Sequence, residues 1–141
     1  MNHNKEELQN VLLTQDELMT DVFHCKKTKF YQHMNQRRCK KMPIVKVNKS
    51  YYSTRELMNK WKCNMVGIPY NNQHNRNDEL LELSYSELCE IFHCSPAKLY
   101  EILKEKDSMG LPIKKNGTKY YLTVDMLESW IEKYSGYDFC Y

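Results

Sequence analysis

The chain has 141 residues, and its 21 Lys and Arg side chains against 18 Asp and Glu give a formal net charge of +3. No stretch approaches the roughly 18 apolar residues of a membrane span, and the polar start over residues 1–7 is not a signal peptide, so we expect a cytoplasmic protein without a membrane segment. The six cysteines come without an export signal or a Cys-x-x-Cys pair and are interpreted as reduced thiols.

The chain carries one sequence pattern twice. Residues 22–61 and 91–130 align without a gap at a shift of 69, with identical residues at 12 of 40 positions. A repeat of this length is a duplicated domain, because a solenoid would need at least three shorter units. We therefore predict a basic domain over residues 1–64, an Asn-rich linker over 65–79 and a second, net acidic domain over 80–141.

Charge separates the two copies. Residues 1–70 hold 13 Lys and Arg against 6 Asp and Glu, whereas residues 71–141 hold 8 against 12. Within residues 22–62 there are 12 basic side chains and a single acid, Glu56. Such a concentration of positive charge indicates a polyanionic partner, most simply nucleic acid.

In the first copy, Thr14 followed by Glu17 has the form of a capping box at the start of a short helix. A second helix is predicted over residues 26–35, two strands over 43–47 and 50–53, and a closing helix over 54–61. The turn between the strands would be Asn48-Lys49, a weaker hairpin signal because Lys adopts positive φ less readily than Asn.

The second copy repeats this order. Ser84 and Glu87 predict a capping box, and Ser95-Pro96 predicts the start of the second helix. Residues 111–115 and 118–122 read as strands around an Asn116-Gly117 turn, in which both turn residues would have positive φ. A third helix is predicted over residues 123–131, so that the whole chain belongs to the α+β class.

Two short helices, a β-hairpin and a closing helix form a winged helix-turn-helix. Residues 84–88, 95–100, 111–113 and 127–130 also resemble the excisionase-type, MerR-like DNA-binding domain, over about 45 residues of each copy. The resemblance implies two tandem winged helix-turn-helix domains in a small phage or mobile-element protein. Such a protein binds double-stranded DNA and either directs an integrase toward excision or regulates transcription. The family usually has glycine at the turn where this chain has His24 and His93, so some strain is expected there.

The resemblance implies that the second helix of each copy enters the major groove and that the hairpin, the wing, contacts backbone or minor groove. Gln32 and Asn35 lie on the outer face of the first copy's helix, where each can read adenine through two hydrogen bonds. The basic residues around them would neutralise phosphates. The predicted DNA-binding residues of the first copy are Lys26, Lys27, Thr28, Lys29, Tyr31, Gln32, Asn35, Arg37, Arg38, Lys46 and Lys49.

The second copy offers a less favourable surface to a polyanion, since Glu101 replaces Gln32 on the outer face. Its predicted DNA-binding residues are Lys98, Tyr100, Lys104, Lys114, Lys115 and Lys119. Two interpretations stay open: this copy reads DNA with fewer phosphate contacts, so that one chain works as a pseudo-dimer, or it has become a protein-binding face. In the second case the protein would be an adaptor or inhibitor that grips an integrase or another host or phage protein.

Other chemistry finds little support in the sequence. His24-Cys25 and His93-Cys94 have the donor atoms that zinc prefers, but each copy lacks further ligands at suitable spacing. No Gly-rich phosphate loop, nucleophile motif or pair of catalytic carboxylates is present, so we predict neither an enzyme nor a bound cofactor or metal.

Overall fold

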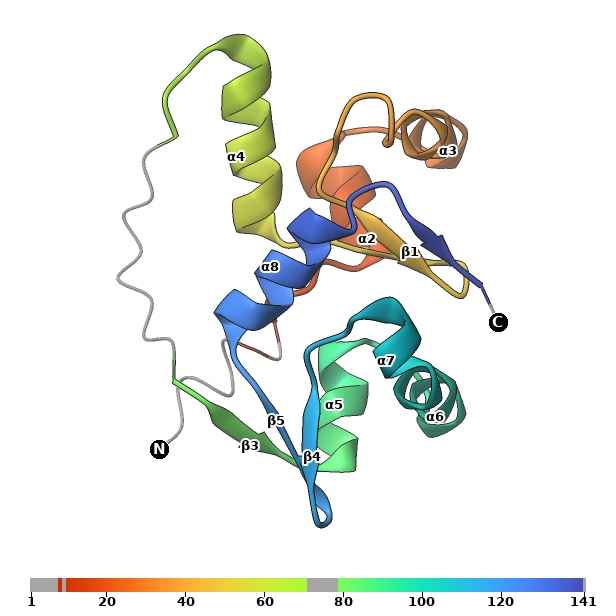
Figure 1. Ribbon diagram of the computed structural model, residues 1–141. Coiled ribbons are helices and arrows are strands. Elements are labelled where there is room, and N and C mark those ends of the chain that lie inside the picture. The colour runs from red at the N-terminus through yellow and green to blue at the C-terminus, as the bar shows by residue number, and fades with distance from the viewer. Residues whose placement is uncertain (1–7, 9, 71–78, 141) are drawn as a thin grey trace. The chain divides into compact units, whose positions relative to one another are not determined.

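The structure, a computed structural model, describes Leu8, residues 10–70 and residues 79–140 (Figure 1). It is mixed α+β, and its contacts divide the chain into two units. The first-copy unit comprises the described residues of Leu13–Asn75 and Ile131–Cys140, and the second-copy unit comprises those of Arg76–Trp130 and of the N-terminal segment up to Leu12. The two units are thus each completed by a segment from the far end of the chain.

This division differs from the predicted boundaries at both ends. The C-terminal residues 131–140 belong with the first copy because they add a strand to its hairpin. Leu12 belongs with the second copy, where its carbonyl accepts a hydrogen bond of 2.8 Å from His93 Nε2. The predicted linker also begins too early, since residues 65 and 66 are helical; its residues 71–78 lie outside the described part of the chain.

The first-copy unit follows the predicted order of elements. Helix α2 (Gln15–Glu17) continues into a π-helical turn, η1 (Leu18–Val22), and α3 (Lys27–Asn35) follows after a short break. Strands β1 (Val45–Val47) and β2 (Ser50–Tyr52) form the hairpin, and α4 (Arg55–Val66) runs five residues beyond the predicted end. Gly67, in the left-handed conformation, ends α4, as glycine commonly does at a helix C-terminus.

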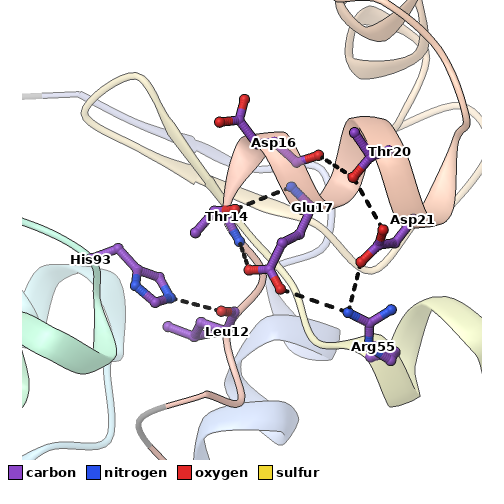
Figure 2. A network of polar contacts seen from close by, with 8 residues as sticks. All are labelled: Leu12, Thr14, Asp16, Glu17, Thr20, Asp21, Arg55 and His93. Carbon is purple, nitrogen blue, oxygen red and sulfur yellow. Dashed lines mark hydrogen bonds and ion pairs between the residues drawn. The ribbon is translucent and has the colours of Figure 1, made fainter.

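A polar network fixes the start of this unit (Figure 2). The predicted capping box is present: Glu17 N donates to Thr14 Oγ1 at 3.1 Å, and Thr14 N donates to Glu17 Oε1 at 3.0 Å. Arg55, at the start of α4, bridges Glu17 at 3.7 Å and Asp21 at 3.1 Å. The hydrogen bond from Arg55 holds the pKa of Asp21 below its ordinary value. The network therefore links the first helical segment to α4.

The core of the first-copy unit lies between these helices and the hairpin. Phe30 and Met34 of α3 are fully buried, one turn apart, so one face of α3 packs inward. Phe30 meets Tyr51 of β2 edge to face, with ring centroids 5.5 Å apart. The remaining buried members of this core are Leu13, Leu18, Val22, Met42, Ile44 and Met58. Burying a side chain such as Phe30 contributes about 1.5–3 kcal/mol, which holds α3 against the hairpin.

The sheet of the first-copy unit has three strands in the order β2-β1-β6, in which β6 (Asp138–Phe139) was not predicted. Strands β1 and β2 pair antiparallel, whereas β6 pairs with β1 in parallel, with Lys46 opposite Asp138. Lys46 N donates to Tyr137 O at 3.0 Å and Asn48 N donates to Phe139 O at 2.8 Å. In Figure 1 this strand lies along β1 near the C-terminus.

The second-copy unit contains β3 (Leu81–Leu83), α5 (Tyr85–Ile91), α6 (Pro96–Lys104), α7 (Lys106–Met109), β4 (Lys114–Asn116), β5 (Lys119–Leu122) and the larger part of α8 (Val124–Lys133). Its sheet has the order β3-β5-β4, so the third strand lies on the opposite side of the hairpin from that in the first copy. Neither β3 nor α7 was predicted.

The two helix starts predicted for this copy are confirmed. Glu87 N donates to Ser84 Oγ at 3.2 Å and Ser84 N donates to Glu87 Oε1 at 2.9 Å. Ser95 caps α6 by accepting from Lys98 N, with Pro96 in the first turn.

The two hairpin turns differ from the prediction in how many of their residues have positive φ. The second copy turns at Gly117-Thr118, since Asn116 already pairs with Lys119, and only Gly117 of this turn has positive φ. The predicted Asn116-Gly117 turn is therefore wrong by one residue. In the first copy, both Asn48 and Lys49 have positive φ, at 45° and 72°. The turn that the sequence marks less strongly is the one with two left-handed residues.

His24 and His93, at equivalent positions of the two copies, occupy left-handed backbone, with φ of 49° and 51°. A residue other than glycine is strained at positive φ, so both copies keep this turn geometry without the glycine that would adopt it without strain.

Among the residues that the structure describes, no helix combines the length and the apolar character that a bilayer crossing requires.

Candidate nucleic-acid interface

The outward face of α3 carries most of the side chains predicted to bind DNA in the first copy. Because Phe30 and Met34 point into the core, the intervening positions face solvent. Tyr31 is 44% exposed, and its hydroxyl accepts a hydrogen bond of 3.2 Å from Gln15 Nε2. The other exposed members of this face are Lys26, Lys27, Thr28, Lys29, Gln32 and Asn35.

The N-terminus of α3 is open in a way that the matching helix is not. Lys26 is the N-cap residue, and its side chain makes no cap hydrogen bond, so it leaves the amides of the first turn without a side-chain acceptor. Amides at a helix N-terminus point outward and bind phosphate. In α6, Ser95 already accepts from the amide of Lys98, and Pro96 has no amide hydrogen to give. The first copy is therefore better suited to an anion at this end.

His33, a residue of α3, is a titratable group close to the lysines of this surface. His33 stacks on Phe23 with ring centroids 4.8 Å apart. Its pKa is lowered below the ordinary histidine value, first by burial and then by the positive charges of Lys29 and Lys40.

Arg37 does not belong to this surface, and its predicted contact with DNA is corrected. Its side chain is only 7% exposed; Nη1 donates to Met34 O at 2.9 Å, and Nη2 pairs with Asp138 of β6. The guanidinium also lies over the Tyr51 ring, 5.4 Å from the centroid. Burial lowers the pKa of Arg37. A guanidinium used in this way stabilises the unit and is not available to phosphate.

The basic residues after α3 and in the hairpin are placed unequally. Arg38 and Lys49 are exposed, with Lys49 at the hairpin tip. Lys46 is half-buried in the central strand of the sheet, and its ammonium lies 5.3 Å from the centroid of the Tyr51 ring. Because β6 covers the outer edge of β1, the tip residue Lys49 is the more accessible of the two to nucleic acid.

In the second copy, the predicted residues form two exposed groups. Tyr100, which is 61% exposed, and Lys104 lie on the outer face of α6 together with Glu101, whereas Lys98 is half-buried. Lys114, Lys115 and Lys119 are exposed on the hairpin, where the Lys115 ammonium lies 5.8 Å from the Tyr120 ring centroid. The helix face is mixed in charge and the hairpin is basic.

The sequence missed the residues that close the first-copy sheet. Asp138 and Phe139 lie in a strand of two residues, too short for a sequence pattern to identify, and their partner strand is far away in the chain. Gly136, with φ of +83°, was a detectable signal for a sharp bend before this segment. A Cβ at Gly136 would lie 3.0 Å from Arg38 Cα, so glycine is needed where the segment passes the end of α3.

Comparison of the chain with protein-family models, curated proteins and solved structures finds no match.

Proposed function

We propose that the first-copy unit is a winged helix-turn-helix that binds double-stranded DNA with α3 in the major groove. The observation that carries this proposal is the outer face of α3: an uncapped N-terminus flanked by Lys26, Lys27 and Lys29, followed by exposed Gln32 and Asn35. Lysines and backbone amides would hold phosphates, while the two amide side chains read bases. The protein would serve as an excisionase-like recombination factor or as a transcriptional regulator.

Salt dependence tests the phosphate contacts. Without Arg37, the exposed groups at α3 and the hairpin tip can meet about four phosphates, so log K should fall with log salt at a slope of about −3.6, from about 0.9 per phosphate. Fluorescence anisotropy of a labelled random duplex, measured at several salt concentrations, gives this slope. Affinity independent of salt would refute the proposal.

Aligned substitutions then assign the copies. Lys29 and Lys98 occupy equivalent positions in the repeat. Lys29→Ala should reduce the magnitude of the slope of log K against log salt by about 0.9, the contribution of one phosphate contact. If only the first copy binds DNA, Lys98→Ala should leave slope and affinity unchanged, and if both bind, the two variants should lose affinity alike.

Base reading requires a selected site. After enrichment of a preferred duplex from a random pool, Gln32→Ala should lose about 1–3 kcal/mol of discrimination at one base pair while binding to random duplex stays the same. Equal losses on selected and random duplex would remove Gln32 as a base-reading residue.

The second-copy unit supports a second candidate function, the binding of a protein. Strand β4 stands at the edge of its sheet and all three of its residues are exposed, whereas its equivalent in the first copy, β1, is covered by β6. An exposed edge accepts an added strand from a partner. Cross-linking from the β4 variant Lys115→Cys in host lysate, with and without competitor DNA, tests this: a protein partner should cross-link even when competitor DNA is present. Cross-links to DNA alone would exclude β4 as a protein-binding edge.

A further inference from the structure

A pocket of about 350 Å³ opens in the first-copy unit, among the stretch that connects α3 to β1, helix α4, and the end of α8 with the turn after it. Its apolar part consists of Pro43, Leu57 and Trp61, of which the first two are buried and the Trp is half-buried. The indole is held in place because its Nε1 donates to Lys40 O at 3.0 Å. The volume is at the lower end of the range for small-molecule sites.

Cationic side chains surround this apolar part. Arg38, Lys41 and Lys60 all line the pocket and are all exposed. Glu132 is an acid among the lining residues, and its carboxylate lies 3.9 Å from Lys60 Nζ. Three positive charges against this carboxylate leave the rim with an excess of positive charge, which favours an anionic ligand.

The duplication shows that the cations are not required by the fold. Trp61 and Pro43 keep identical counterparts in Trp130 and Pro112, so the apolar part belongs to the shared core. The positions of Arg38, Lys41 and Lys60 are occupied in the second copy by Asp107, Gly110 and Ser129. The positive rim is therefore a property of the first copy alone.

The tryptophan also differs between the copies. Trp130 is 3% exposed and its Nε1 donates to the carbonyl of Met109, a residue of α7 with a fully buried side chain. The equivalent position in the first copy is the exposed Lys40, in a stretch without a helix. The first copy thus has an exposed lysine where the second copy has a buried methionine, and its tryptophan is half-buried where that of the second copy is buried.

We propose that this pocket binds a small phosphate-bearing molecule with a planar aromatic ring, of the nucleoside monophosphate class. The ring packs against Trp61, an interaction that contributes about 1–3 kcal/mol for a nucleobase on an aromatic side chain. The phosphate takes charge-assisted hydrogen bonds from Arg38, Lys41 and Lys60. The site is separate from the outer face of α3, so the first-copy unit carries a ligand site besides its proposed DNA surface.

The two tryptophans provide a probe and an internal control in one measurement. Nitrogen-15-labelled full-length protein gives two indole N–H signals, which Trp61→Phe assigns. Titration with adenosine monophosphate should shift the Trp61 signal to saturation and leave the Trp130 signal in place. Adenosine and inorganic phosphate, each with half of the recognised chemistry, should bind about tenfold more weakly or worse.

Matched lysine variants locate the charge. Lys60→Gln should weaken adenosine monophosphate about three- to tenfold, because one charge-assisted contact to phosphate is lost. Lys133→Gln, at another exposed lysine of the same unit that does not line the pocket, should change the affinity less than twofold. Unchanged amide signals of Lys46 and Asn48, which donate hydrogen bonds to the C-terminal segment, report that the first-copy unit stays folded in each variant.

Several results would overturn the proposal. One is the absence of a saturable Trp61 shift with adenosine monophosphate at about 10 mM, roughly ten times a millimolar dissociation constant. Others are equal shifts of Trp61 and Trp130, or equal effects of Lys60→Gln and Lys133→Gln. A shift of Trp61 with a short 5′-phosphorylated duplex but not with the free nucleotide would also overturn it, and would assign the pocket to a nucleic-acid end instead.

Discussion

Replacing Asp138 with Asn should lower the free energy of unfolding of the first-copy unit by about 1–2 kcal/mol. Asp138 pairs with Arg37, whose side chain is 7% exposed, while Asp138 itself is 55% exposed. Breaking a buried ion pair costs about 3–5 kcal/mol and losing a charged hydrogen bond about 1.5–3 kcal/mol. Because water reaches Asp138 and screens the pair, we expect a value at or below the lower of these ranges.

Thermal unfolding of the full chain measures the effect. In a domain of this size, 1 kcal/mol moves Tm by about 4–8 °C, so a loss of about 1–2 kcal/mol in Asp138→Asn should lower the Tm of the first-copy unit by roughly 4–16 °C. Asp107→Asn is the matched control, since Asp107 is 94% exposed and pairs with Lys106 at the surface. The control should change stability by less than about 0.5 kcal/mol.

Hydrogen exchange shows where the loss occurs. The amides of Lys46 and Asn48 donate to the C-terminal segment, so Asp138→Asn should speed their exchange ahead of the other amides of the hairpin. If Asp138→Asn unfolds no earlier than Asp107→Asn and these two amides keep their protection, Arg37 does not depend on Asp138 and the reasoning is refuted.

Three further changes have defined outcomes. Burial raises the pKa of the Cys94 thiol to about 11, so the fraction of Cys94 present as thiolate at pH 8 is on the order of one in a thousand. Mass spectrometry should show the exposed Cys39 alkylated more than about a hundredfold faster than Cys94, whose rate should still rise toward pH 11. Similar rates for the two cysteines would contradict the burial of Cys94. Gly136→Ala should destabilise the first-copy unit by about 2 kcal/mol, because φ is +83° and the new Cβ would lie 3.0 Å from Arg38 Cα. Urea titration measures this loss, and an unchanged midpoint would contradict it. His24→Gly should leave the free energy of unfolding unchanged or raise it by up to about 1 kcal/mol, because it relieves backbone strain. His93→Gly should lower it, because this variant also loses the 2.8 Å hydrogen bond to Leu12 O. Equal effects of the two variants would argue against that hydrogen bond.

Local signals in the sequence predicted local structure well. Thr14 with Glu17 and Ser84 with Glu87 form capping boxes because each pair needs only its own helical turn to find its hydrogen bonds. The inward positions of α3, Phe30 and Met34, follow from helical periodicity alone. The outer face of α3 could be predicted for the same reason, since it is what the buried face leaves over.

Features that depend on distant partners could not be predicted. Arg37 belongs to a run of basic residues, and only the arrival of Asp138 and the Tyr51 ring turns it inward. Strand β3 has only three residues, Leu81–Leu83, and is defined by its pairing with β5. The pocket at Trp61 could not be predicted because Trp61 and Trp130 are identical in the repeat, and only the structure shows that their exposure differs.

The pairing of β6 with β1 imposes an order of events during synthesis. Lys46 and Asp138 are 92 positions apart, and a ribosome adding about 5–20 residues per second needs roughly 5–20 s to cover that stretch. Throughout this interval the nascent first copy has an uncovered strand edge and an Arg37 without its carboxylate, and the whole second copy emerges in between. A message cut short after the first copy, or a fragment ending at Asn71, would keep the polypeptide in that condition. The three-stranded sheet of the first-copy unit is therefore completed only after the second copy has been synthesised.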